Sequence, residues 1–100
     1  MKEEIERLNK EAEALRLQDP ARAEELARKA QALAHEIGDR AGLAESWLNL
    51  AVVYEEKGED ERAIELYCEA LAIGEQVSNK SLIATVCLNL GRLYSKKARD

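Results

Sequence analysis

Apolar residues recur at steps of three and four along most of this chain, which is the spacing of one face of an α-helix. Turn and capping residues interrupt the pattern at Asp19-Pro20, Gly38, Gly58 and Ser78. The sequence therefore predicts an all-α fold of five helices in one domain, residues 1–100. It is organised as a hairpin over 2–37, a hairpin over 40–77 and a last unpaired helix over 79–97.

The most informative stretch runs from Ala44 to Ile73, where small and large apolar residues share helical faces. These are Trp47, Leu50, Ala51 and Tyr54, then Ala63, Tyr67 and Ala70. We expect the alanines to let two helices approach closely while the tryptophan and tyrosines fill the volume beside them. The order resembles the tetratricopeptide repeat (TPR), with Ala51 in place of its glycine and Tyr67 in place of its phenylalanine; the trailing proline is absent. The resemblance implies helical hairpins stacked as an α-solenoid that binds other proteins.

The same unit returns at a period of about forty residues, longer than the usual period of the family. Cys87, Leu90, Gly91 and Tyr94 take the places of Trp47, Leu50, Ala51 and Tyr54. Such long-period repeats resemble those of bacterial signalling proteins and of motor-cargo and cell-polarity adaptors. The first helix fits the signature least well.

Composition narrows the classes of function. A formal net charge of -5 argues against general binding to nucleic acid or anionic membranes. Met1 is followed directly by charged residues, so the sequence predicts no secretory signal. No apolar run is long enough to span a membrane. Two cysteines in a helical chain make no disulfide framework. We expect a cytoplasmic protein.

No pattern of catalytic, cofactor-binding or metal-ligating residues stands out, so the sequence predicts a protein that is not an enzyme. His35, beside Glu36 near a helix end, is expected to be solvated. Cys87 falls at a core position of the repeat, whereas Cys68 points away from the Tyr67 face. Whether Cys68 is reactive stays open.

The candidate binding surface is the concave face that the resemblance assigns to the first helix of each hairpin. Asn9, Asn49 and Asn89 recur there at equal spacing. A carboxamide both donates and accepts, so it can pair with the backbone of a bound peptide; the resembling asparagine of long-repeat adaptors implies this role. The alternative is that the Asn-Leu pair merely follows the repeat consensus. The other expected peptide contacts are Leu48, Leu88, Val52, Arg92 and Lys96. The basic end of this groove suits an acidic residue or a terminal carboxylate of the peptide, or it only complements a helix dipole.

Apolar residues surround much of the last helix, so one of its sides is expected to remain open. A homodimer through Leu82, Val86 and Leu93 would cover it, as would further repeats, while polar residues near its end would make it a cap. The first 31 residues use strong helix formers and interleaved charges, as engineered helices do. Sequences from thermophiles show the same enrichment. An engineered scaffold without a natural ligand therefore stands beside the peptide-binding module as an alternative.

Overall fold

The computed structural model describes residues 1–99, which form five α-helices joined by short turns and no strand. The helices are α1 (Lys2–Leu15), α2 (Pro20–Ile37), α3 (Arg40–Glu56), α4 (Asp60–Gln76) and α5 (Lys80–Arg99). The predicted all-α fold is therefore confirmed.

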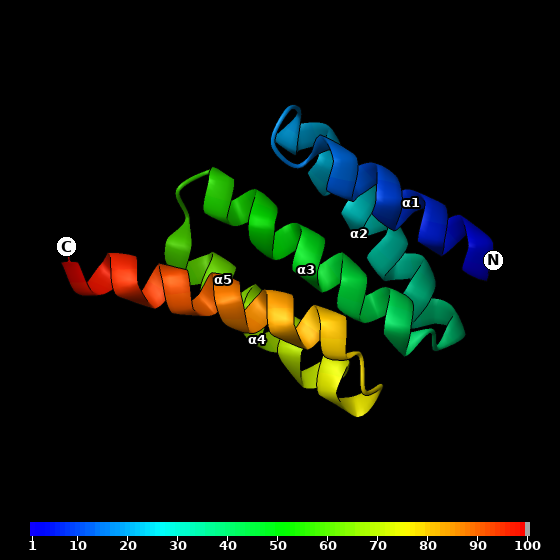
Figure 1. Ribbon diagram of the computed structural model, residues 1–100. Helices are drawn as coiled ribbons and strands as arrows, with labels where there is room; N and C mark the ends of the chain where they lie inside the picture. Colours follow the sequence, from blue (N-terminus) through cyan, green and yellow to red (C-terminus); the bar gives the residue numbers. More distant parts are fainter. Residues whose placement is uncertain (100) are drawn as a thin grey trace.

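The helices form two layers (Figure 1). α1, α3 and α5 lie side by side in one layer, and α2 and α4 lie behind them in the second. Each helix packs mainly against its neighbours in the sequence, and α3 also contacts α1 and, to a smaller extent, α5. This zigzag of antiparallel hairpins is the arrangement of an α-solenoid, as the sequence predicts.

The turns between the helices repeat one local geometry. Gly38, Gly58 and Ser78 each have a positive φ, of 74°, 83° and 55°. After each of them the next residue donates its N–H to a carbonyl in the last turn of the preceding helix, with Glu59 N to Tyr54 O at 2.9 Å as one example. Asp39 and Asn79 then accept the N–H of a residue three positions later and so cap α3 and α5. The repeat seen in the sequence is thus a repeat of turn chemistry as well.

The core is centred on the contact between α3 and α4. Tyr67 is fully buried there, and Ala51, Ala63 and Ala70 are fully buried around it. Trp47, expected in the same buried group, packs against this core but does not belong to its fully buried part. Trp47 is only partly buried, at a shallow depression lined by residues of α2 such as Gln31 and His35. Its position on α3 faces the edge of α2 rather than the small-residue seam with α4.

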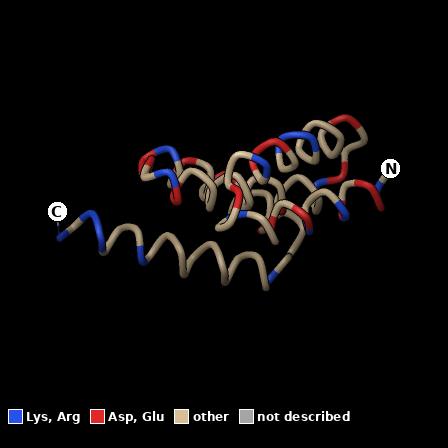
Figure 2. The backbone as a smooth tube through the Cα atoms, turned by 90° about the horizontal axis from the view of Figure 1, so that it is seen from above, with Lys and Arg blue, Asp and Glu red and all other residues tan. Residues whose placement is uncertain are grey.

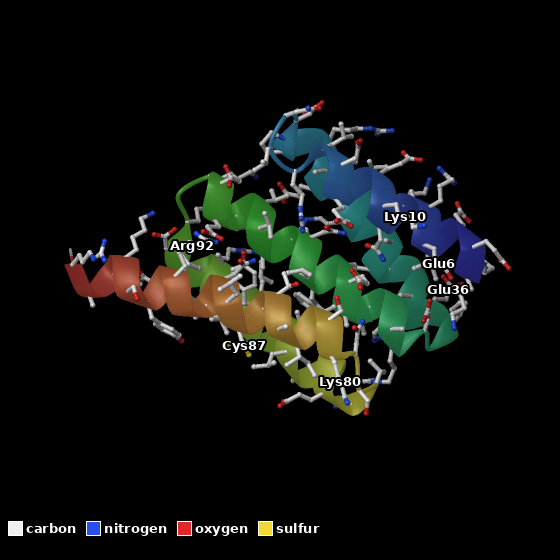
Figure 3. All side chains as sticks on the ribbon, in the orientation of Figure 1. Glu6, Lys10, Glu36, Lys80, Cys87 and Arg92 are labelled. Carbon is white, nitrogen blue, oxygen red and sulfur yellow. The ribbon has the colours of Figure 1, made fainter. Side chains whose placement is uncertain are left out.

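Two expectations about α5 are corrected by its orientation. Leu82, Val86 and Leu93 are buried, because this side of α5 packs on the preceding helices; the side chain of Leu82 lies against Gly74 of α4. They are therefore not open to a second copy of the chain. Cys87 is exposed rather than in the core, at the outer edge of α5 (Figure 3).

The turns generate a prediction with a matched pair of variants. Ser78 adopts the left-handed backbone conformation, which costs a residue with a side chain roughly 1–2 kcal/mol. Gly38 adopts the same conformation in the equivalent turn without that cost, because glycine has no Cβ. We expect Ser78→Gly to stabilise the chain by about 0.5–1 kcal/mol and Gly38→Ser to destabilise it by a similar amount. Urea unfolding followed by circular dichroism measures both. Destabilisation by Ser78→Gly would contradict the assignment of this turn.

Candidate functional site

A groove of about 330 Å³ opens between α1 and the N-terminal half of α3, on the layer of α1, α3 and α5. Most of the residues that line it are polar or charged, although the stems of these side chains make much of its wall apolar. The lining consists of Lys2, Glu6, Asn9, Lys10 and Glu13 from α1, Asp39, Ala41, Gly42 and Glu45 around the start of α3, and Asn79 from the turn before α5. Figure 3 shows Glu6 and Lys10 on α1 at this side of the molecule.

The floor of the groove depends on a close approach between α1 and α3. Gly42 makes this possible, because a Cβ there would lie only 2.6 Å from the Ile5 side chain and 2.6 Å from the Asp39 carboxylate. Asn9 donates from its side chain to the Gly42 carbonyl oxygen at 3.1 Å. Asn49 donates back to the carbonyl oxygen of Asn9 at 3.1 Å and to its side-chain oxygen at 3.3 Å. The two asparagines therefore bind the helices to each other.

Both of these asparagines are buried. Asn9 is 5% exposed and Asn49 is 2% exposed. The side-chain oxygen of Asn49 also accepts a hydrogen bond from the Arg16 guanidinium at 3.2 Å. Asn9 lines the groove but its amide is engaged with α3, whereas neither Asn49 nor Leu48, which is buried in the core, is among the residues that line it. Equal spacing identified the asparagines as equivalent, but it did not reveal that their partners are the neighbouring helices.

Asn89 differs from the other two asparagines. It is half-buried and donates to the hydroxyl of Tyr67 on α4 at 3.2 Å instead of to the backbone of α3. Leu82 of α5 stands where α3 has Gly42, so the close approach that α1 makes to α3 has no equivalent between α3 and α5. The three equally spaced asparagines therefore do not make equivalent contacts, because Asn89 does not repeat the contact that joins Asn49 to Asn9.

The remaining predicted contacts lie at or near the surface of the same layer. Val52 is half-buried and Leu88 is exposed. Arg92 reaches from α5 to the Glu55 carboxylate at the end of α3 (Figure 3), and Lys96 lies 3.1 Å from a carboxylate oxygen of Asp60. The basic end predicted for the groove is thus already neutralised within the chain.

The half-buried carboxyl of Glu45 and the neighbouring Glu13 repel each other in the groove when both are charged. Burial raises the pKa of the Glu45 carboxyl above its ordinary value, and the negative charge of Glu13 raises it further. Within residues 1–99, neither carboxylate forms an ion pair, and the same holds for Glu6. A positively charged group in the groove would relieve this repulsion.

The other face of the molecule holds a charge cluster around Tyr54. Glu24 accepts hydrogen bonds from Lys57 at 2.6 Å, from the Tyr54 hydroxyl at 2.7 Å and from Arg28 at 3.1 Å. Arg62 lies 4.8 Å from the centre of the Tyr54 ring, within the range of a cation–π contact. The cluster joins α2, α3 and α4 through hydrogen bonds to the Glu24 carboxylate and contacts with the Tyr54 ring, so it contributes to packing between these helices.

Comparison with known proteins adds the family. The family model for the tetratricopeptide repeat matches residues 6–76, which span α2, α3, α4 and most of α1. The chain belongs to the tetratricopeptide repeat family. Its repeats generally mediate protein–protein interactions, and the family is typically non-enzymatic. No curated protein and no solved structure matches the chain.

Two structural searches bear on other kinds of site. Across the part of the chain that the structure describes, no group of three or more His, Cys, Asp or Glu residues is placed to hold a metal ion. None of the helices described here has the combination of length and apolar character that a bilayer crossing requires.

The asparagine clamp between α1 and α3 yields a stability prediction. Asn49→Ala should cost about 1–3 kcal/mol, because it removes the hydrogen bonds that Asn49 makes to Asn9 and Arg16 at a buried position. Asn89→Ala should cost less, since water can replace the amide at its half-buried position. Chemical denaturation of both variants measures the difference. Equal costs would contradict the distinct roles assigned to the two amides.

The Glu24 cluster yields a pH dependence. Hydrogen bonding to Lys57, and then to Tyr54 and Arg28, lowers the pKa of Glu24 from its ordinary value of 4.5 to about 2. A lowered folded-state pKa contributes stability above the unfolded-state pKa, and this contribution is lost as the pH falls from about 4.5 towards 2. Glu24→Gln should therefore be less stable than the wild type at pH 7, by an amount that shrinks across this interval. Urea unfolding at several pH values, with the exposed Glu25→Gln as control, measures it. A gap independent of pH would contradict the role of the Glu24 charge.

Proposed function

We propose that this TPR chain is a protein-interaction module that binds a segment of a partner protein along the layer of α1, α3 and α5. The groove between α1 and α3 carries the proposal, because it is concave, lined by polar groups from two helices, and large enough for side chains of an extended segment. Interaction with other proteins is also the general role of the family.

The groove favours a segment with a basic side chain. Glu6, Glu13 and Glu45 line it and form no ion pair with the described residues. Lys2 and Lys10 line it as well, so three carboxylates stand against two cations in the groove. A lysine or arginine of the partner would pair with the carboxylates and lower the pKa of Glu45 that burial has raised.

Further contacts of the segment follow from what remains exposed on the same layer. Val52, Asn89, Arg92 and Lys96 lie beyond the groove towards α5 and are proposed to contact the rest of the segment. Asn9 and Asn49 contribute by holding the groove in shape, since their amides are engaged between the helices. The cytoplasmic location expected from the sequence stays a prediction.

An array of extended peptides that vary in charge tests the proposal. The full chain should retain peptides with lysine or arginine in preference to matched acidic peptides. A double variant, Glu13→Gln with Glu45→Gln, should weaken that binding by about tenfold, the effect of losing charge-assisted hydrogen bonds worth about 1.4 kcal/mol. Fluorescence anisotropy with the best peptide gives the affinity.

The control removes the same charge elsewhere. Glu36→Gln with Glu69→Gln changes two exposed carboxylates of α2 and α4 that lie outside the groove. It should leave the affinity unchanged. Equal retention of the peptide by both double variants would place the binding site outside this groove.

A further inference from the structure

The side of α5 that does not contact α4 presents an apolar surface. Leu88 is 74% exposed and Tyr94 is 53% exposed, which makes them two of the most exposed large apolar residues described. Ala84, Cys87 and Gly91 are exposed beside them. Contiguous exposure of this kind marks interaction surfaces more often than isolated apolar residues do.

The internal repeat identifies what packs on this surface in the preceding unit. Ala84, Leu88 and Gly91, here named the open face, correspond at a spacing of forty residues to Ala44, Leu48 and Ala51 of α3. Those three are 0%, 7% and 0% exposed. They share a helical face with Glu55, and Glu55 accepts the hydroxyl hydrogen bond of Tyr67 from α4 at 2.7 Å. α4 therefore meets this face of α3, and Arg92 of α5 reaches the same Glu55 carboxylate at its end.

The open face has the shape to receive such a helix. A Cβ at Gly91 would meet nothing within 4 Å, so the space that α4 occupies at Ala51 is unfilled at Gly91. Small residues on both sides of Leu88 would let another helix backbone approach, as Ala51, Ala63 and Ala70 do between α3 and α4. A helix with small residues along the side that contacts α5 would fit against the open face.

The charges of α5 determine which kind of partner helix is favoured. α5 contains Lys80, Arg92, Lys96, Lys97 and Arg99 and no Asp or Glu, and Figure 2 shows basic but no acidic positions along it. Three of these cations pair with acids of α3 and α4: Arg92 with Glu55, Lys96 with Asp60 at 3.1 Å and Lys97 with Glu61 at 3.0 Å. Lys80 and Arg99 form no ion pair with the described residues, so these two cations carry the attraction for an acidic partner. A second α5 would bring like charges together, which is destabilising. An acidic helix is favoured instead.

We propose that the open face of α5 docks an amphipathic helix of a partner protein that is acidic and carries a stripe of small residues. The helix packs against α5 as α4 packs against α3. This surface is separate from the groove between α1 and α3, and the proposal does not rest on the function assigned to that groove.

The test uses a probe taken from the chain itself. A fluorescent peptide of residues 59–77, carrying Cys68→Ser, has the acidic character and small-residue stripe of α4. Anisotropy titration with the full chain should show saturable binding that weakens as salt is raised, because screening reduces the attraction between acidic peptide and basic α5. A peptide with Glu65→Lys and Glu69→Lys should bind at least about tenfold more weakly. Equal binding of the two peptides would overturn the requirement for an acidic helix.

Matched variants of the chain locate the binding. Leu88→Asp should weaken it by about tenfold or more, whereas Leu17→Asp, at a leucine 72% exposed in the turn before α2, should leave it unchanged. Gly91→Gln fills the unfilled space without touching a neighbour and should block binding in a chain whose circular dichroism is unchanged. Binding that survives both changes on α5 would overturn the proposal.

Sedimentation of the chain alone tests whether a second copy of the chain occupies the open face. The proposal expects a monomer whose mass does not rise with concentration. A dimer that Leu88→Asp dissociates would show that a second copy covers the open face, and would overturn the assignment to an acidic partner helix.

Discussion

Tyr67 is the side chain on which the stack depends. Its ring is fully buried between α3 and α4, in the space that the surrounding alanines leave. Its hydroxyl donates to Glu55 of α3 at 2.7 Å and accepts from Asn89 of α5 at 3.2 Å. Burial, followed by the hydrogen bond to Glu55 and the charge of Glu55, raises the pKa of this hydroxyl, so it remains a hydrogen-bond donor across the physiological range. One residue thus joins three successive helices.

The fold could be predicted because its determinants are local in the sequence. The three-and-four spacing of apolar residues gives the helices, and Gly38, Gly58 and the capping residues Asp39 and Asn79 give the turns. The repeated order of aromatic and small residues gives the family and hence the stacking. Each of these signals concerns residues close together in the chain, where helix geometry fixes which of them share a face.

The site was harder to predict because it depends on which neighbour each face meets. The asparagines at 9 and 49 look equivalent to the one at 89 in the sequence, yet two are buried between helices and the third is not. The difference comes from Gly42, which admits α1, and from Leu82, which occupies the equivalent position on α5. Trp47 and Cys87 show the same effect, since both have the periodicity of core residues but lie at an edge. Periodicity identifies a face, and only packing shows what covers it.

The one-sided packing of α5 has a consequence for motion. α5 is held through Leu82, Val86, Leu90 and Leu93, while α3 is covered by helices on several sides. In a linear stack, stability is close to a sum of neighbour contacts, so the end helix with the fewest contacts detaches at the lowest free-energy cost. Amide hydrogens of α5 should exchange with solvent through local opening, while those of α3 and α4 require unfolding of the whole chain. Covering α5 with another helix would remove this difference and extend one cooperative unit to the end of the stack.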